Sequence, residues 1–166
     1  MPDQGRLRRI RLRGSWRTWL ALVVSLLLVA NGAYQLISAH TVSYSWYEFQ
    51  IGGRPACLPT AETPAARAHG LMGVSHPVPM VFVFDPPQVA AFWMKDTPEP
   101  LTGAWVAAAS NRVVGYWHGI PNSLVNHVAP RPVRYVIEYP RGWSPPPLGT
   151  AVLRPVRHRC PAGARL

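Results

Sequence analysis

The chain of 166 residues has few lysine, cysteine and acidic side chains. Lys95 is the only lysine among 17 basic residues, Cys57 and Cys160 are the only cysteines, and seven residues are acidic. The sequence has no C-x2-C or H-x3-5-H pair for zinc and no glycine-rich loop that would cradle phosphates. Paired carboxylates for glycoside chemistry would have to come from Asp96 and Glu99, which share one loop. These absences argue against an enzyme, and we expect no metal and no cofactor.

Positive charge is concentrated at the N-terminus. Six arginines and one aspartate precede residue 18, whereas the net charge of the whole chain is +10. An apolar segment follows at 19–39, and as a helix it would be about 31 Å long, close to the hydrocarbon thickness of a bilayer. A basic tail beside such a segment indicates membrane topology rather than nucleic-acid binding. We predict a cytoplasmic tail (1–18), a transmembrane signal anchor (19–39), an extracytoplasmic domain (40–160) and a C-terminal tail (161–166).

A cleaved signal peptide is the alternative to the anchor. Its apolar run would be 19–30, with Ala33 or Ala39 at the cleavage site. A clear A-x-A site is missing, which favours the retained anchor. Both alternatives export the same domain, so the protein is expected to be either a single-pass membrane protein or secreted.

The two cysteines both fall in the exported part. In an oxidising compartment, cysteines near opposite ends of one domain can form a disulfide. We expect a Cys57–Cys160 disulfide, and the alternative is two separate thiols, one buried and one in a loose tail.

The exported part alternates short apolar runs with turns rich in glycine and proline. Strands are predicted at 48–51, 56–58, 80–84, 90–94, 104–109, 112–117, 133–139 and 150–155. Thr63 and Pro64 have the pattern of a helix start, and this short helix is expected to reach about Leu71. We therefore expect a mainly β fold: a compact barrel- or sandwich-like domain of seven to eight short strands with one short helix, preceded by the transmembrane helix.

Two details of this pattern bear on the candidate site. Asp85-Pro86-Pro87 is expected to end the strand at 80–84, because proline cannot donate to a sheet. Residues 133–139 alternate, which puts Glu138 on the face opposite Tyr135 and Ile137.

Several motifs occur in the order and spacing of one known family. They are Arg-Ala-His-Gly-Leu-Met (67–72), Met-Val-Phe-Val-Phe (80–84), Phe-Trp-Met-Lys-Asp-Thr (92–97), Pro-Leu (100–101), Arg-Tyr-Val-Ile-Glu (134–138) and Gly-Trp (142–143). The chain thereby resembles the "domain of unknown function 192" family of small exported or membrane-anchored prokaryotic domains, over about 56–153. The resemblance implies a fold and a location but no activity. Two positions depart from the family pattern: Asp96, usually Asn, and Thr102, usually acidic.

The block at 92–97 divides into an apolar part and a polar part. Phe92, Trp93 and Met94 are expected in the core, whereas Lys95, with Asp96 and Thr97, could bind an anion or act as a base if desolvated. Alternatively, Lys95 lies along the surface, Asp96 caps the following turn and Thr97 packs locally.

Arg67 and Glu138 complete the candidate site. Glu138 is the only acidic residue in the last third of the chain, so it is the natural partner of the Arg67 guanidinium, more often in a structural pair than in a ligand clamp. The candidate ligand-binding residues are thus Arg67, Lys95, Asp96, Thr97 and Glu138, and no catalytic residue is assigned.

Metal binding has one sequence argument in its favour. Met72, Met80 and Met94 offer thioethers, which select Cu(I), and His69 and His76 could join them. Methionine is also a common core residue, and we favour that interpretation. For zinc, His118 and His127 lack a recognisable third ligand.

The sequence thus favours a membrane-tethered extracytoplasmic accessory or binding module without catalysis. Exposed aromatics and prolines at 115–126 and 142–147 suit a protein or glycan partner. The alternative is a small enzyme or small-ligand binder with a polar site around Arg67, Lys95, Asp96 and Thr97. A polar cleft of ligand size would favour this alternative, and a solid core with flat aromatic loops would favour the module.

Overall fold

The structure is a computed structural model that describes Trp16 and residues 19–20, 22–27, 42–154 and 160. The chain divides into two units, Met1–Thr41 and Val42–Leu166. Described residues of the first unit are helical and exposed, and no helix in the described part is long and apolar enough to cross a membrane. Most of the predicted tail (1–18), most of the predicted anchor (19–39) and the tail at 161–166 lie outside the described residues. The anchor therefore stays a prediction.

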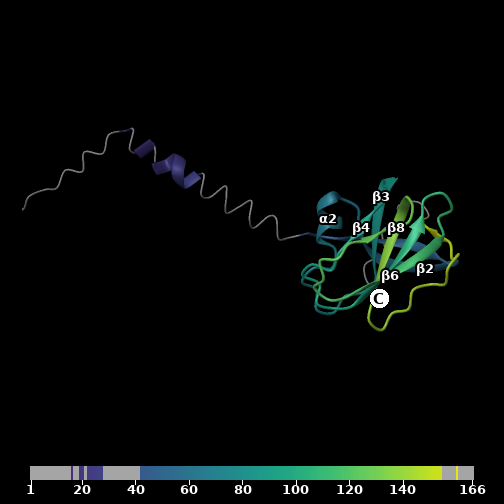
Figure 1. Cartoon of the computed structure of the whole chain (residues 1–166). Coiled ribbons are helices and arrows are strands. Elements are labelled where there is room, and N and C mark those ends of the chain that lie inside the picture. The colour runs from purple at the N-terminus through teal and green to yellow at the C-terminus, as the bar shows by residue number, and fades with distance from the viewer. Residues whose placement is uncertain (1–15, 17–18, 21, 28–41, 155–159, 161–166) are drawn as a thin grey trace, which may run out of the picture. The chain divides into compact units, whose positions relative to one another are not determined.

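The second unit consists mainly of β-strands (Figure 1). In chain order its elements are β1 (Ser45–Ile51), β2 (Arg54–Ala61), α2 (Pro64–His69), β3 (Met80–Gln88), β4 (Ala91–Phe92), β5 (Leu101–Ala107), β6 (Val113–Gly119), β7 (His127–Val128), β8 (Val133–Pro140) and β9 (Val152–Leu153). Seven strands form one sheet in the order β6-β5-β8-β3-β2-β1-β9, and β4 pairs with β7 in a second, two-stranded sheet. All neighbours are antiparallel except β2 and β3. The predicted mainly β domain is confirmed.

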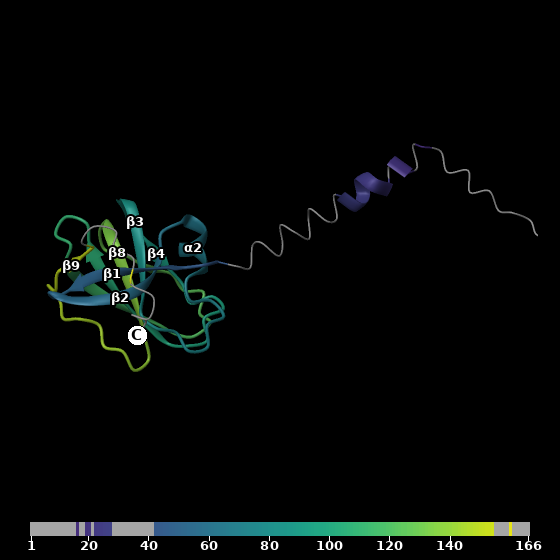
Figure 2. The same cartoon turned by 180° about the vertical axis from the view of Figure 1, so that it is seen from behind.

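The large sheet curls into a half-barrel, as both views show (Figure 2). Residues 149–152 join its two ends at one corner. On one side Val152 pairs with Ile51 at the end of β1. On the other, the Val113 amide donates to the Thr150 carbonyl over 2.9 Å, at the start of β6. The sheet edges are therefore bonded to each other at this corner, which limits the exposed edge.

Alternating side chains on the curled strands form two apolar clusters. One cluster draws on strands from both ends of the sheet, including Phe49 of β1, Val113 of β6 and Ile137 of β8. Only the concave side brings these strands together, so this cluster fills the curl. The other cluster joins Phe82 of β3 to Ala66 of α2, and therefore lies on the opposite face beneath the helix. The site is built on this second face.

Helix α2 begins where the sequence predicts. Thr63 is its N-cap, accepting a 3.1 Å hydrogen bond from the Ala66 amide, and Pro64 is the first helical residue. The helix ends at His69, two residues earlier than expected, because Gly70 takes a positive φ of 51° and its amide bonds to the Ala66 carbonyl.

Strand β3 is longer than the sequence predicts. It continues through the prolines to Gln88, while its pairing with β8 shifts register between Val83 and Gln88. Pro86 and Pro87 fall in this stretch without ladder partners, so their missing N–H groups break no bond of the sheet. The prediction that Asp85-Pro86-Pro87 ends the strand is therefore wrong.

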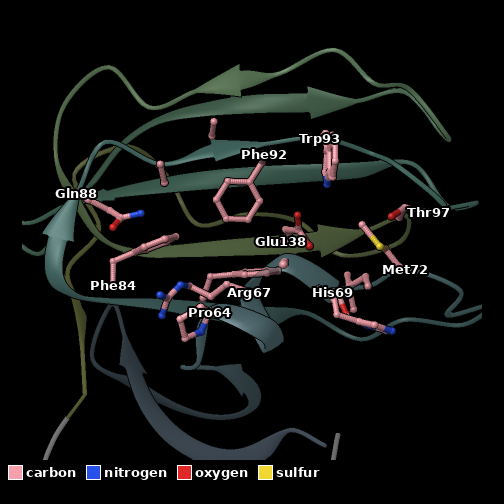
Figure 3. Close-up of a pocket in the computed structure, with 16 residues that line it drawn as sticks. Pro64, Arg67, His69, Met72, Phe84, Gln88, Phe92, Trp93, Thr97 and Glu138 are labelled. Atoms are coloured by element: carbon pink, nitrogen blue, oxygen red, sulfur yellow. The ribbon is translucent and has the colours of Figure 1, made fainter. Parts of the chain in front are cut away.

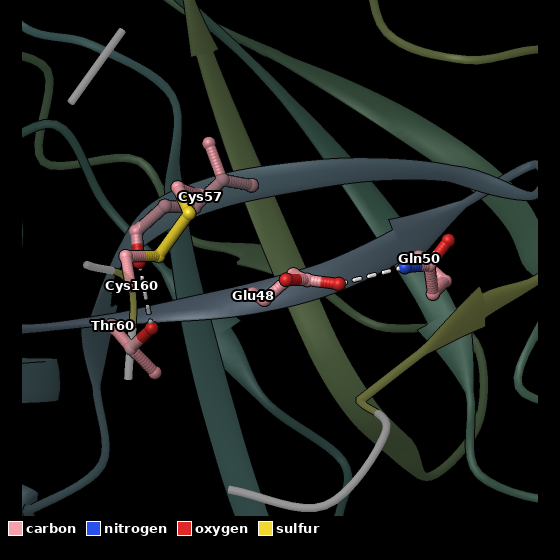
Figure 4. The surroundings of a disulfide bond; sticks show 6 residues. Glu48, Gln50, Cys57, Thr60 and Cys160 are labelled. Atoms are coloured by element: carbon pink, nitrogen blue, oxygen red, sulfur yellow. Dashed lines mark hydrogen bonds between the residues drawn. A yellow bond between two sulfur atoms is a disulfide. The ribbon is translucent and has the colours of Figure 1, made fainter. Parts of the chain in front are cut away.

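The predicted disulfide between Cys57 and Cys160 is present (Figure 4). Their Cα atoms are 5.9 Å apart and 103 residues separate them in sequence. The Cys160 amide also donates to the Trp46 carbonyl over 3.1 Å. This connection ties a C-terminal residue to the β1–β2 hairpin.

Candidate functional site

A pocket of about 350 Å³ lies between α2 and the sheet face beneath it (Figure 3). The helix and the turn after it form one wall, and β3, the β4 region and β8 form the rest. It is lined by Pro64, Arg67, Ala68, His69, Gly70, Leu71, Met72, Phe82, Phe84, Gln88, Ala90, Ala91, Phe92, Trp93, Thr97 and Glu138. A cavity of this size, lined by aromatic rings together with polar side chains, is large enough for a small molecule.

Glu138 supplies the carboxyl group at the inner end of the pocket. In the sheet it lies opposite Met80 on one side and Gly103 on the other. Gly103 in turn lies opposite Trp117, whose indole covers the glycine so closely that an added Cβ would be 1.8 Å from Nε1. Glu138 therefore lies between the Met80 thioether on β3 and Gly103 on β5, which the indole of Trp117 on β6 covers. The Glu138 side chain points toward the pocket (Figure 3).

This carboxyl group is buried without a partner. Glu138 is 3 % exposed, and no hydrogen bond or ion pair reaches its carboxyl from the residues that the structure describes. Burial raises its pKa from 4.5 to about 8, since the charged form loses its hydration. Near neutral pH the pocket therefore holds a protonated carboxyl group whose hydrogen-bonding capacity is unused.

Tyr44, in the segment before β1, contacts two residues of the pocket wall without lining the pocket itself. Its hydroxyl donates to the Gly70 carbonyl over 2.6 Å and lies 3.1 Å from His69 Nδ1. Burial, reinforced by the nearby Glu138 carboxyl, raises the pKa of Tyr44 to about 12. The hydroxyl thus stays neutral and fixes the end of α2 in place.

Arg67 lines the pocket without pairing with Glu138. Its Nη1 donates to the Val83 carbonyl over 2.9 Å and also to the Glu62 carbonyl. The guanidinium carbon lies 5.1 Å from the centre of the Phe84 ring. These contacts fasten α2 to β3, so the expected Arg67–Glu138 pair is replaced by a bridge from Arg67 to backbone oxygens.

The segment at 92–97 places one tryptophan at the pocket and not in the core. Phe92 and Met94 are buried, but Trp93 between them is 45 % exposed, as the alternation of an extended segment requires. The prediction that Trp93 is a core residue is therefore wrong. Lys95 is exposed, with Nζ 5.7 Å from the centre of a Trp93 ring.

The turn that follows is held by its backbone. Asp96 is exposed with a φ of 51°, and its carbonyl accepts from the Gly73 amide over 2.8 Å. Thr97 is buried, and its hydroxyl donates to the Lys95 carbonyl over 3.1 Å. The structure thus brings Arg67, Thr97 and Glu138 to one pocket and leaves Lys95 and Asp96 outside its lining.

Sequence reasoning missed Tyr44, Trp93 and Gln88 as parts of this site. The motif around His69 marked the segment, but nothing in its spacing shows that it faces Glu138. A lone acidic residue directly after the apolar run 135–137 was the one available signal of a buried carboxyl group.

The sulfur and imidazole groups considered for metals are dispersed. Met80 and Met94 are buried in the apolar cluster, whereas Met72 lines the pocket. His118 Nδ1 lies 3.2 Å from the Thr102 hydroxyl, and the His127 ring stacks on Trp117 at 4.7 Å. In the part of the chain that the structure describes, no group of three His, Cys, Asp or Glu side chains is arranged to hold a metal ion.

Comparison with known proteins assigns the family. The family model described as "Uncharacterized ACR", domain of unknown function 192, matches residues 48–146. The chain belongs to this family. No curated protein matches it.

Two solved structures share the fold of this member of family 192. A protein of unknown function from Novosphingobium aromaticivorans DSM 12444 is 22 % identical, with a TM-score of 0.57, over 70 % of this chain and 96 % of its own. A suggested transcription regulator from Sinorhizobium meliloti 1021 is 25 % identical, also with a TM-score of 0.57, over 68 % of this chain and 96 % of its own. These likenesses establish the architecture and assign no activity.

The two departures from the pattern of family 192 lie away from the Glu138 pocket. Asp96 is on the exposed turn, and Thr102 lines a second, shallower pocket of about 230 Å³. That pocket is formed by Pro100, Leu101, Thr102, His118, Gly119, Tyr139, Pro140, Arg141 and Trp143. Neither Asp96 nor Thr102 belongs to the lining of the first pocket.

Proposed function

We propose that this protein binds a small molecule in the pocket beneath α2. The observation that carries the proposal is Glu138, a carboxyl group that is buried, unpaired in the described part of the chain and directed into a cavity of about 350 Å³. Leaving a polar group buried without a partner costs free energy. A ligand that bonds to it recovers this cost, so the cavity and the carboxyl group support the same function.

The pocket walls also support binding rather than packing alone. Phe82, Phe84 and Phe92 form edge-to-face contacts, with the Phe82 and Phe92 ring centres 4.8 Å apart. These rings are fixed by their neighbours and present a preformed apolar surface, which a ligand can cover without ordering the protein. Trp93, half exposed at the rim, provides a further flat surface.

The proposal can be tested by placing a large side chain on α2 that occupies the pocket. Ala68 lines the pocket, whereas Ala65, one turn earlier on the same exposed side of α2, does not. We expect small compounds that raise the melting temperature of the full chain in mild detergent to act equally on Ala65→Trp and to lose their effect on Ala68→Trp. The proposal is wrong if no compound of a broad set stabilises the wild type. It is also wrong if the compounds that stabilise the wild type stabilise Ala68→Trp equally.

We further propose that the domain acts on the outer side of a cell membrane, tethered through 19–39. The basic tail before an apolar segment supports this orientation, and the Cys57–Cys160 disulfide suits an oxidising compartment. Lys95 is exposed and is the only lysine, which makes it a selective reporter. A membrane-impermeant amine reagent should label Lys95 in intact protoplasts, with Lys95→Arg as control. Labelling only after lysis would contradict this location.

The predicted protein or glycan partner stays a prediction. In the two segments that suggested it, Ile120 is 72 % exposed and Trp143 is 42 % exposed. These side chains are accessible for a contact, and the proposed small-molecule site does not depend on them.

A further inference from the structure

We infer that the pocket takes an organic ammonium ion with an apolar body, whose nitrogen pairs with the Glu138 carboxylate. This inference rests on the proposed function and adds the chemical class of the ligand. It follows from three features of the pocket: the absence of a cationic partner for Glu138, the aromatic rings around it and the charged groups that face it.

The first feature is that the hydroxyl and guanidinium donors around Glu138 are bonded elsewhere, whereas the uncharged Trp117 Nε1–H on the same sheet face is buried without a partner in the described chain. The Tyr44 hydroxyl donates to the Gly70 carbonyl, and the Thr97 hydroxyl donates to the Lys95 carbonyl. Arg67 Nη1 is held by the Val83 and Glu62 carbonyls. The described chain therefore provides a buried acid without the cation that would normally accompany it, and an ammonium ligand would supply both the charge and the N–H donors.

The second feature is the aromatic lining. Phe82, Phe84, Phe92 and Trp93 surround the cavity, and the faces of such rings attract cations. The rim already shows this preference: Lys95 Nζ lies 5.7 Å from a Trp93 ring centre, and the Arg67 guanidinium lies 5.1 Å from the Phe84 centre. Aromatic faces combined with one carboxylate are the chemistry that recognises ammonium groups.

The third feature is the set of titratable groups that face Glu138. Tyr44, from the segment before β1, stays neutral because its pKa is raised to about 12. Helix α2 contributes His69 and Arg67, and the guanidinium charge of Arg67 is turned toward two carbonyl oxygens. Neighbouring strands contribute Met80 and Gly103, which carry no charge. Arg67 is thus bonded to backbone carbonyls and not to Glu138, and an ammonium ion would be the counter-ion of Glu138.

Binding would release a proton. Burial keeps Glu138 protonated below about pH 8, whereas pairing with an ammonium ion requires the carboxylate. The proton leaves Glu138 for solvent as the ammonium ion enters, and no bond of the ligand changes. Because only the ionised fraction is competent, apparent affinity should rise about tenfold per pH unit up to about pH 8.

Calorimetry on the full chain in mild detergent tests this with three probes of one shape: benzylamine, benzyl alcohol and benzoate. We expect benzylamine to bind at least about tenfold more tightly than the other two at pH 7, with release of about one proton per molecule bound. Glu138→Gln should remove this preference and the proton release, while binding of benzyl alcohol stays within about twofold. Trp93→Ala, at an exposed position, should weaken benzylamine more than benzyl alcohol, because only the cation is attracted by the face of the ring, and this comparison serves if Glu138→Gln fails to fold.

The results distinguish failure of the ammonium class from failure of the small-molecule site. Stronger binding of benzoate or benzyl alcohol than of benzylamine, lost in Ala68→Trp, overturns the ammonium class and leaves the small-molecule site standing. Benzylamine binding that is unchanged by Glu138→Gln or independent of pH also overturns it. If none of the three probes binds at millimolar concentration, the ammonium class is wrong, and the compound screen on Ala68→Trp separately decides the proposed function.

Discussion

At the scale of single residues, the burial of Glu138 lowers the stability of the fold and leaves a carboxyl group that a ligand can bind. The pKa of Glu138 is about 8 in the folded protein and has the ordinary value of 4.5 in the unfolded chain. Between pH 4.5 and 8 the folded protein therefore holds a proton that the unfolded chain has released. The folded state therefore binds more protons than the unfolded state over this interval, so stability falls as pH rises from about 4.5 to 8. Above pH 8 both states are ionised and this contribution no longer changes.

Replacing Glu138 by Gln should remove this pH dependence. The amide has a similar shape but does not titrate. The free energy of unfolding of the variant, relative to that of the wild type, should therefore rise by about 1.4 kcal/mol per pH unit between pH 5 and 8. Urea unfolding of both proteins at pH 5, 6, 7, 8 and 9 measures the difference. An equal stability difference at pH 5 and pH 8 would show that Glu138 titrates normally in the folded state.

Gly103 is the second residue whose role is open to direct test. Alanine there would place a Cβ 1.8 Å from Trp117 Nε1, so the indole must move, and we expect a loss of about 1–3 kcal/mol with altered tryptophan fluorescence. The matched control is Gly115→Ala, whose nearest neighbour, Trp105 Cδ1, would lie 3.5 Å away in ordinary contact. Equal stability of the two variants in urea would mean that the close approach of Trp117 to Gly103 is not needed.

At the scale of elements, α2 forms the outer wall of the pocket through short-range contacts. It has only six residues and is too short to be stable alone, so its cap and its anchors to the sheet determine its position. Thr63 caps the first turn, Arg67 bonds to the Val83 carbonyl of β3, and Tyr44 holds the Gly70 carbonyl at the end. Binding in the pocket should therefore be sensitive to changes at these three residues.

Loss of the helix cap should destabilise the domain. Thr63→Ala removes the oxygen that accepts from the Ala66 amide and should lower the free energy of unfolding by about 1 kcal/mol. Thr63→Ser keeps that oxygen and should unfold within a few tenths of a kcal/mol of the wild type. If the alanine and serine variants have the same urea midpoint, the cap does not stabilise α2.

The elements also show what the sequence could predict. The 63–64 helix start, the strands at 48–51 and 56–58 and the alternation that places Glu138 opposite Ile137 are local patterns, and the structure confirms them. The path of β3 through Pro86 and Pro87 depends on a register shift against β8, which local sequence does not reveal. The second, two-stranded sheet likewise depends on pairing between residues 35 and 37 positions apart.

At the scale of the whole molecule, the pocket could not be predicted because its residues come from distant segments. Arg67, Thr97 and Glu138 were identified as polar residues in apolar surroundings, but their meeting depends on β3 lying between β2 and β8. Lys95 and Asp96 follow Trp93 in sequence and yet lie outside the pocket lining, because the extended segment alternates and then turns. Proximity in sequence was a poor guide here.

The disulfide acts on the whole domain. It closes a loop of 103 residues, which restricts the unfolded chain, so replacing both Cys57 and Cys160 by Ser should cost about 2–4 kcal/mol. Urea unfolding with and without reductant measures this. Reductant should destabilise the wild type by a similar amount and leave the double variant unchanged. An equal effect of reductant on both proteins would be inconsistent with a stabilising disulfide.

If Glu138 is a buried acid that binds a cationic ligand, the titration of its carboxyl group must respond to that ligand. The chain has four glutamates, Glu48, Glu62, Glu99 and Glu138, so the carboxyl carbons of the labelled full chain can be followed individually by NMR. We predict that Glu138 titrates near pH 8 in the free protein and at least one pH unit lower with saturating benzylamine. A Glu138 that titrates near 4.5, or whose pKa is unchanged by the amine, would contradict the account.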